Sequence, residues 1–174
     1  MDINIYAPLI EECRKGSSRA QFRLYNQYCK AMYNLAYRIL HNREDAEDML
    51  QEAFIECFRS IDSFRFESTL GAWLKRIMVN KCINHIKRKK IDLTLSEALP
   101  EVIYEEDEEV KYDTGKIFKS IELLPDGYRI ILTLYLLEGY DHGEISQILG
   151  ISESTSKSQY SRAKEKLRSI LSNK

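Results

Sequence analysis

Two runs of opposite charge carry most of the binding chemistry that the sequence offers. From Glu44 to Phe58 there are six acidic side chains and no basic one, and from Lys75 to Lys90 there are seven basic side chains and no acidic one. The acidic run suits a basic protein surface, and the basic run suits a polyanion such as DNA. Two alternatives stay open: both runs are solvated helix faces, or the two helices attract each other within the fold.

Residue types that could catalyse a reaction or hold a metal are scattered along the chain. The four cysteines stand 16, 28 and 25 residues apart (Cys13, Cys29, Cys57 and Cys82), and the three histidines are equally dispersed (His41, His85 and His142). A zinc site needs ligands at short spacings, so we predict no metal and expect the cysteines to be small apolar packing residues. A Gly-rich phosphate loop, a GxSxG elbow and an HExxH helix are also missing from the sequence. We therefore predict no catalytic residue and no cofactor, and a protein that is not an enzyme.

The composition favours helices. Of the 174 residues, 44% are hydrophobic, which is ample for a core, and only seven are Gly and three Pro. So few breakers argue against a turn-rich β fold. The sequence has no apolar run of about 18 residues, which predicts no membrane insertion, and its first residues do not read as a secretory signal. We therefore expect a cytoplasmic protein.

Charge divides the chain into three segments. Residues 1–90 carry 16 basic and 11 acidic side chains, a net charge of +5, and residues 116–174 carry nine basic and seven acidic ones, a net charge of +2. Residues 91–115 carry one basic and nine acidic side chains, a net charge of −8, and lose helical periodicity. We predict an all-α fold of two small helical domains, residues 1–90 and 116–174, joined by an acidic linker over 91–115.

The first domain begins with two predicted helices. Residues 19–41 read as an aromatic-rich helix in which Leu35 and Ile39 help to bury one side. Asn42 is expected to cap the next helix, with Asp45 three positions on as in a capping box. That helix has apolar residues at spacings of three and four (Ala46, Met49, Leu50, Ala53, Phe54, Cys57, Phe58 and Ile61), with its acidic side chains on the opposite face.

A loop and a third long helix complete this domain. Phe64 and Phe66, in the loop 63–68, either anchor the loop to the core or contact a ligand. From Thr69 to about Lys90, one helix face gathers apolar residues (Leu74, Met78, Val79, Cys82, Ile83 and Ile86) and the other gathers mostly polar and basic ones (Trp73, Arg76, Ile77, Asn80, Asn84 and Lys87). Trp73, the only tryptophan, either stacks on a base beside groups that hold phosphates or packs against a neighbouring helix.

The second domain has the pattern of a helix-turn-helix. A helix around 116–123 precedes an apolar helix with Pro125 in its first turn and Gly139 at its end. A short helix over 141–149, a turn at Gly150 and a cap at Ser152 lead into a last helix reaching about Leu171. A small, polar, basic outer face on this helix is expected to enter a DNA major groove (Ser154, Lys157, Ser158, Ser161, Arg162 and Lys164). The alternative is a bare helical hairpin.

Three segments together resemble a known family. They are DAEDMLQEAFIECF at 45–58, TLGAWLKRIMVNKCINHIKRKK at 69–90 and the helix-turn-helix at 124–171. In this order, with an acidic segment between the second and the third, they resemble a bacterial RNA polymerase sigma factor of the sigma-70 family. The chain is most similar to the extracytoplasmic-function (ECF) group, which keeps only regions two and four. The resemblance covers roughly residues 18–90 and 116–171, and it implies a protein that performs no covalent chemistry.

The resemblance implies roles for individual residues. Asp48, Gln51 and Glu52 match the segment that grips the coiled coil of the polymerase β′ subunit, and the β subunit is an implied partner as well. Positions implied to contact the −10 promoter element lie in the loop and on the basic helix (Phe64, Phe66, Trp73, Arg76, Asn80, Asn84, Lys87 and Arg88). The last helix matches the reader of the −35 element, although Ser156 replaces a usually aliphatic residue and Gln159 a commonly basic one.

Further partners and rival classes follow from the same comparison. The resemblance implies an anti-sigma protein that holds the factor inactive, together with core RNA polymerase and promoter DNA as partners. A stand-alone helix-turn-helix regulator with a helical sensor domain would explain residues 116–174 but would leave the two charged runs as coincidence. A helical enzyme would need a cluster of reactive side chains that the sequence does not suggest.

Overall fold

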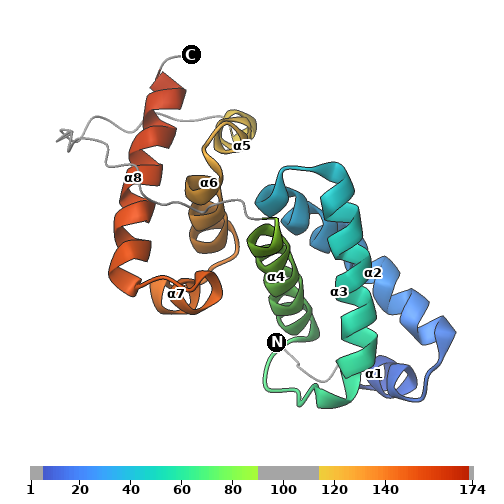
Figure 1. The fold of residues 1–174 in the computed structure, drawn as a ribbon. Helices are drawn as coiled ribbons and strands as arrows, with labels where there is room; N and C mark the ends of the chain where they lie inside the picture. The colour runs from blue at the N-terminus through green and yellow to red at the C-terminus, as the bar shows by residue number, and fades with distance from the viewer. Residues whose placement is uncertain (1–5, 90–113, 173–174) are drawn as a thin grey trace. The chain divides into compact units, whose positions relative to one another are not determined.

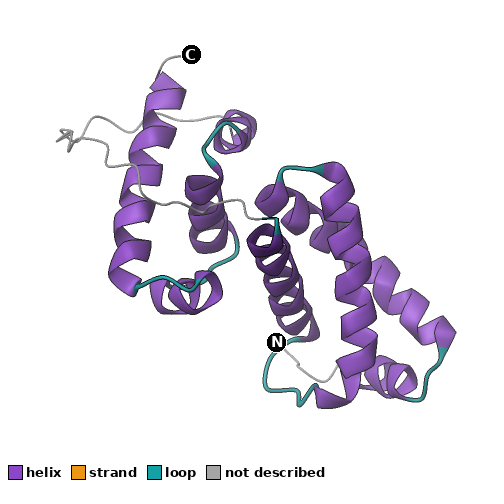
Figure 2. Cartoon of the chain, in the orientation of Figure 1, coloured by secondary structure: helices purple, strands orange, loops and turns teal. Residues whose placement is uncertain are grey.

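The computed structural model describes residues 6–89 and 114–172, and the regular elements of these residues are all helical (Figure 1, Figure 2). The chain divides into two compact units, Met1–Ile91 and Asp92–Lys174. The predicted all-α class is therefore confirmed for the described residues. The predicted linker, residues 91–115, lies outside them except for Thr114 and Gly115, which begin a helix instead.

Unit one is a small bundle of four helices and a short 3₁₀ turn. Its elements are α1 (Ala7–Arg14), α2 (Ser18–Leu40), α3 (Arg43–Ser60), η1 (Ile61–Ser63) and α4 (Leu70–Arg88). Helices α2, α3 and α4 pack against one another, and α1 packs against α2 and η1 (Figure 1). The helix faces predicted to be apolar form this core, because all six apolar residues predicted on α4 and six of the eight predicted on α3 are buried within these helices.

Polar caps fix where the helices of unit one begin. Asn42 Oδ1 accepts a hydrogen bond from the backbone N–H of Asp45 at 2.9 Å, as predicted. Thr69 Oγ1 does the same for the backbone N–H of Ala72 at 3.2 Å, at the start of α4. Each cap satisfies a backbone donor that has no partner within its helix. The Asp45 side chain, in contrast to the predicted capping box, extends to α4, where its carboxylate contacts Lys89 at 2.7 Å.

Three of the four cysteines of unit one are buried packing residues, whereas Cys29 is half-buried. Cys13, Cys57 and Cys82 are buried and carry free thiols. Burial raises the pKa of Cys57 to about 12, and burial likewise raises the pKa of Cys82 to about 12. Both thiols are therefore protonated near neutral pH, which is the state of an inert core cysteine and not of a nucleophile.

Unit two is built from α5 (Thr114–Glu122), α6 (Asp126–Leu132), η2 (Thr133–Leu137), α7 (His142–Leu149) and α8 (Glu153–Ser172). Its core joins α5, α6 and α8 through a cluster of apolar residues (Ile121, Leu124, Leu132, Ala163 and Leu167). Pro125 is the N-cap of α6 and not its first helical residue. The second half of the predicted apolar helix is a π turn, in which the N–H of Glu138 donates to the carbonyl oxygen of Thr133 at 3.0 Å. This wider turn displaces the following side chains from α-helical positions, and Leu136 is 50% exposed.

The predicted helix-turn-helix is confirmed in its local geometry. Gly139 and Gly150 have φ angles of +78° and +74°, a backbone conformation that glycine adopts without a steric penalty. Asp141 and Glu144 form a reciprocal capping box at the start of α7. Ser152 Oγ accepts from the backbone N–H of Thr155 at 3.0 Å and so caps α8.

Candidate functional site

A cavity of about 300 Å³ lies in unit one, where the end of α3 and η1 meet α4. Six of its nine lining residues come from α4, and five of these follow one stripe of the helix at spacings of three and four (Trp73, Ile77, Asn80, Asn84 and Arg88). The others are Lys81 of α4, Glu56 and Ser60 of α3, and Ser63 of η1. The stripe is roughly 22 Å long at the helical rise per residue. It combines a large aromatic ring, two amides and a guanidinium, which is the chemistry that holds a nucleobase and its phosphates.

The cavity contains an ion pair that links the two charged runs. Lys81 Nζ lies 3.8 Å from Glu56 Oε2 and 3.6 Å from Glu52 Oε2. Sequence reasoning missed Lys81 and Glu56, because helical spacing shows which residues share a face of one helix but not which face of a second helix they meet. The expectation that acidic and basic helices attract each other within the fold is thus partly confirmed.

A second cluster joins the other ends of α3 and α4. Asp45 Oδ1 lies 2.7 Å from Lys89 Nζ and 3.1 Å from His85 Nε2. The hydrogen bond from Lys89 is the largest cause that holds the pKa of Asp45 below its usual value; burial opposes it, and the nearby His85 and the charge of Lys89 support it. This cluster stabilises the contact between the helices and uses one acid of the run predicted for a partner.

The remaining acidic side chains of α3 face solvent. Glu44, Glu47 and Asp48 are exposed and form no ion pair with another described residue, and Gln51 is exposed beside them. Ile55, one turn beyond Gln51, is an exposed large apolar side chain at 56%. We call this surface, made of Glu44, Glu47, Asp48, Gln51 and Ile55, the outer face of α3. Of the residues predicted to bind core polymerase, Asp48 and Gln51 belong to the outer face of α3, whereas Glu52 forms an ion pair with Lys81.

The loop after η1 is anchored to the core by an aromatic cluster. Phe64 is 3% exposed, and its ring centroid lies 4.9 Å from that of Phe66 and 5.3 Å from that of Trp73. The structure therefore favours the anchor alternative for Phe64, because a ring so deeply buried cannot touch a base. Phe66 is half-buried, and neither phenylalanine lines the cavity. Trp73 packs against Phe64 of the loop and also borders the cavity, so its stacking on a base stays a prediction.

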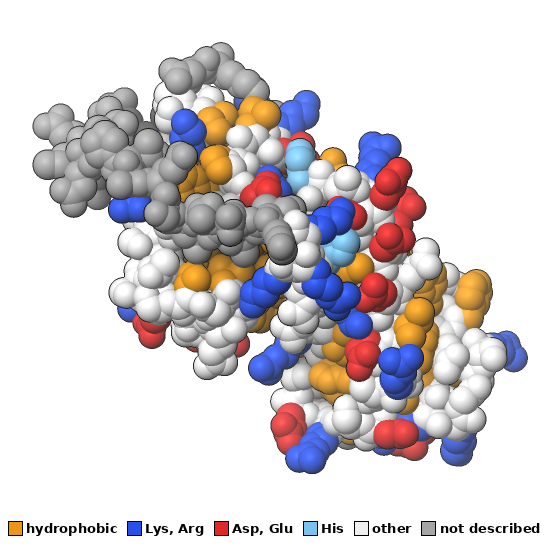
Figure 3. Space-filling view, in the orientation of Figure 1, with side chains coloured by type: hydrophobic (Ala, Val, Ile, Leu, Met, Phe, Trp, Pro, Cys, Tyr) orange, Lys and Arg blue, Asp and Glu red, His pale blue; other side chains and the backbone are white. Residues whose placement is uncertain are grey.

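The other candidate residues of α4 surround this site. Arg76 and Lys87 are exposed but do not line the cavity. Figure 3 shows Lys and Arg side chains gathered over the C-terminal part of α4, where Lys87, Arg88 and Lys89 are all exposed. The cavity therefore opens on a helix whose end is strongly basic.

The outer face of α8 is exposed, as predicted for four of its six candidates. Ser154, Lys157, Ser158 and Ser161 are exposed, whereas the other two candidates, Arg162 and Lys164, are half-buried. The ammonium group of Lys164 lies 4.7 Å from the centroid of the Tyr160 ring, at the side of the helix. A hydrogen bond from Lys157 to Glu153, with the attraction of that carboxylate, raises the pKa of Lys157, which therefore remains charged.

A polar contact that the sequence did not suggest joins α7 to α8. Ser156 is fully buried, and its Oγ lies 2.9 Å from Nδ1 of His142. The His142 ring stacks on the Tyr135 ring, with centroids 4.6 Å apart, and meets the Tyr160 ring edge-on, with centroids 5.6 Å apart. Ser156 stands where the resemblance implies an aliphatic residue. Gln159, which is 3% exposed, is buried on the same inner face of α8.

Within the described residues there is neither a metal-ligand cluster nor a helix that could span a membrane. No group of three or more His, Cys, Asp or Glu side chains in the described part of the chain is placed to hold a metal ion. No helix within residues 6–89 and 114–172 is long and apolar enough to cross a bilayer.

Comparison with protein families assigns both units. Residues 24–91 match the family described as sigma-70 region 2, and residues 115–167 match the family described as sigma-70, region 4. The first match contains α3 and α4 with the cavity between them. The second contains the helix-turn-helix.

Individual relatives and solved structures agree with these matches. The chain is 33% identical to the ECF RNA polymerase sigma factor SigW of Bacillus subtilis, over 93% of this chain and 94% of that protein. It is 32% identical to the ECF RNA polymerase sigma-E factor of Escherichia coli, over 90% of this chain and 89% of that protein. The fold is similar to that of the sigma factor RpoE from Bartonella quintana, solved with the anti-sigma factor NepR, at a TM-score of 0.57 and 22% identity, over 86% and 95% of the two chains. The fold is also similar to that of CnrH, solved with the cytosolic domain of CnrY, at a TM-score of 0.56 and 22% identity, over 95% of this chain and 96% of CnrH.

Proposed function

The chain belongs to the ECF group of RNA polymerase sigma factors, and we propose that three of its surfaces divide the work of promoter recognition. A sigma factor binds core RNA polymerase and directs it to promoters, through recognition and opening of the −10 element and recognition of the −35 element. The observation that carries the assignment of residues is the cavity between α3 and α4, with Trp73 at one end of its stripe and Arg88 at the other.

We assign the capture of an unstacked −10 base to this cavity. Unstacking a base costs a few kcal/mol, and stacking it on an aromatic ring returns about 1–3 kcal/mol. Trp73 supplies the ring, Asn80 and Asn84 supply amide donors and acceptors for the base edge, and Arg88 supplies a cation for the backbone. The volume of about 300 Å³ is at the lower end of the roughly 300–1,000 Å³ of small-molecule sites, which suits one base. Binding energy alone drives the opening, and nucleotide transfer belongs to the polymerase.

We assign core-polymerase binding to the outer face of α3. Its carboxylates are not neutralised by other described residues, and Ile55 adds an apolar contact of the kind found at the centre of protein interfaces. The resemblance placed this contact on the coiled coil of the β′ subunit at Asp48, Gln51 and Glu52. Because Glu52 also pairs with Lys81, we expect Asp48 and Gln51 to contribute more.

We assign the −35 element to the outer face of α8. A capped helix with small polar residues and an exposed cation can enter the major groove, where each base pair presents a distinct pattern of donors and acceptors. Ser154, Ser158 and Ser161 suit hydrogen bonds to base edges, and Lys157 suits a phosphate. Arg162, half-buried at the side of the face, remains a candidate contact, and Lys164 is held nearer to Tyr160.

We infer that an anti-sigma protein is a further partner. The sigma factor RpoE, a structural neighbour named above, was solved with the anti-sigma factor NepR. Co-purification of a specific partner with the tagged chain supports the inference. Constitutive activity of the factor with no such partner counts against it.

The test of the proposed function is in vitro transcription with purified core RNA polymerase and genomic DNA, followed by mapping of the transcript starts. We expect starts preceded by a shared pair of elements that the core enzyme alone does not use. Lys157→Ala should weaken promoter binding and its salt dependence for all −35 sequences alike, whereas Ser158→Ala should change which −35 sequences are preferred. If the reconstituted enzyme starts at no defined position, the assignment is refuted.

A further inference from the structure

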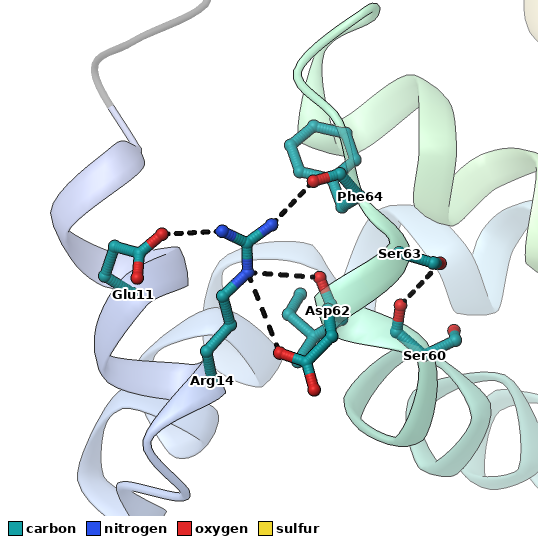
Figure 4. A network of polar contacts seen from close by, with 7 residues as sticks. Glu11, Arg14, Ser60, Asp62, Ser63 and Phe64 are labelled. Atoms are coloured by element: carbon teal, nitrogen blue, oxygen red, sulfur yellow. Dashed lines mark hydrogen bonds and ion pairs between the residues drawn. The ribbon is translucent and has the colours of Figure 1, made fainter.

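The side chain of Arg14 reaches from the end of α1 to the loop that follows α3 (Figure 4). Its Nη2 donates to the backbone carbonyl of Phe64 at 2.6 Å, and its Nε donates to that of Ile61 at 3.5 Å. On its other side, Nη1 lies 2.6 Å from the carboxylate of Glu11, and Nε lies 3.9 Å from that of Asp62. One guanidinium therefore ties both ends of the segment 61–64 to α1.

Arginine is suited to this contact by its shape and charge. The guanidinium is planar and always charged, and it presents its N–H donors in a fixed fork, so that two carbonyl oxygens can be held at once. The Arg14 side chain is 23% exposed, which shelters these hydrogen bonds from water. Glu11, one helical turn earlier on α1, orients the fork from the opposite side (Figure 4).

The loop held by Arg14 has a conformation that needs support. Phe66 has a φ of +59°, in the left-handed region that residues with a Cβ rarely adopt. Such a backbone persists only where the surrounding structure holds it. The guanidinium carbon of Arg14 lies 5.6 Å from the centroid of the Phe66 ring, which places a cation on the strained residue itself.

Residues just before this loop line the cavity between α3 and α4. Ser60 and Ser63 line it, and Ser63 Oγ donates to the carbonyl of Ser60 at 2.7 Å. Phe64, whose carbonyl Arg14 holds, contacts the ring of Trp73. A continuous series of contacts thus runs from Arg14, through the backbone and ring of Phe64, to the aromatic wall of the cavity.

We propose that Arg14 is a positioning residue for base capture: it holds the segment 61–66 so that Trp73 and Ser63 are already in place before DNA arrives. Preorganisation of this kind strengthens binding by reducing the ordering that binding requires. The match to region 2 begins at residue 24, so α1 and Arg14 lie outside it. The inference rests on the proposed function, since it takes the cavity as the site of the captured base.

The test compares single-stranded −10 oligonucleotides with and without the captured base. Fluorescein-labelled non-template strands, intact or with one abasic position at a time, are titrated with holoenzyme assembled from the full-length chain and followed by anisotropy. We expect removal of the captured base to weaken binding about tenfold with the unmodified chain, as loss of a stacked base implies, and less than about twofold with Arg14→Met. Arg14→Lys, which keeps the charge but not the fork, should fall between them.

Arg19→Met is the matched control, because Arg19 is an exposed arginine of the same unit without an ion pair to a described residue. It should keep the full effect of the abasic position. A second readout in the free chain is the emission of Trp73, the only tryptophan, which should move to longer wavelength in Arg14→Met and stay unchanged in Arg19→Met.

The outcomes separate the inference from the proposed function. If Arg14→Met weakens binding of intact and abasic strands equally, or behaves as Arg19→Met does, the positioning role is wrong. If Trp73→Ala keeps the full discrimination against abasic strands, the cavity does not capture the base and the proposed function fails with it. If Trp73→Ala loses that discrimination and Arg14→Met retains it, only the role of Arg14 is refuted.

Discussion

Truncation of Trp73 to alanine should impair promoter opening far more than polymerase binding. The ring borders the cavity and packs against Phe64 with centroids 5.3 Å apart, so its removal takes away the stacking surface for an unstacked base. Stacking is worth about 1–3 kcal/mol per base by alanine substitution, and 1.4 kcal/mol is a tenfold change, so the open complex should be about 5- to 150-fold less stable. Trp73→Phe keeps a smaller ring and should lose less.

The assay follows heparin-resistant complexes and permanganate reactivity of the −10 thymines on a duplex promoter. Affinity for core RNA polymerase is measured in parallel and should change less than about twofold, because Trp73 is not on the outer face of α3. The truncation also removes packing around Phe64, so both measurements are made well below the thermal midpoint of each variant. Equal losses in opening and in core binding, or an unchanged yield of open complex with Trp73→Ala, would refute the assignment of the cavity.

Three further perturbations address other parts of the structure. Asp48→Lys should lower affinity for core polymerase about tenfold in competition assays, and this loss should become smaller at high salt. The control Glu122→Lys, an exposed charge reversal on α5, should leave the affinity unchanged. Similar losses for both variants would contradict the role of the outer face of α3. Because contacts with Lys89 lower the pKa of Asp45 in the folded state, its carboxylate stabilises the fold above the unfolded-state pKa of about 3.9 and loses this contribution as the pH falls. The free energy of unfolding of the unmodified chain should therefore converge on that of Asp45→Asn as the pH falls through and below about 3.9. A difference that stays constant with pH would be inconsistent with the contact. Ser156→Ala removes the hydrogen bond to His142 and should destabilise unit two by about 1 kcal/mol. The thermal midpoint of unit two should fall by about 4–8 °C. An unchanged midpoint would show that the hydrogen bond contributes nothing to stability.

Local pattern accounts for the parts of the fold that each helix decides alone. The apolar stripes of α3 and α4, the caps at Asn42 and Ser152 and the glycine turn at Gly150 follow from side-chain spacing and backbone sterics, so they are predictable from a short stretch of sequence. The exposure of Ser154, Lys157 and Ser158 follows in the same way, because a helix with one apolar face must turn the opposite face to solvent.

What local pattern left open or missed lies where two segments meet. The sequence allowed Phe64 to be either a core anchor or a ligand contact, and only the packing of the loop onto α4 leaves it 3% exposed. Glu52 looks like part of a free acidic face, yet the crossing of α3 and α4 brings it to Lys81. The π turn at Thr133–Leu137 was not predicted, since the sequence around it is equally compatible with an ordinary α-helix.

The sequence by itself therefore determined the helices, their inner and outer faces, the two-part organisation and the family resemblance, because these depend on periodicity and on motifs within single segments. Tertiary structure alone decided which charges remain available to partners and which residues enclose the cavity. Arg14 and Phe64 are 50 positions apart, and so are not neighbours in any local pattern. They meet because α1 packs against η1, and a contact of that kind is set by the packing of whole helices and not by the spacing within one of them.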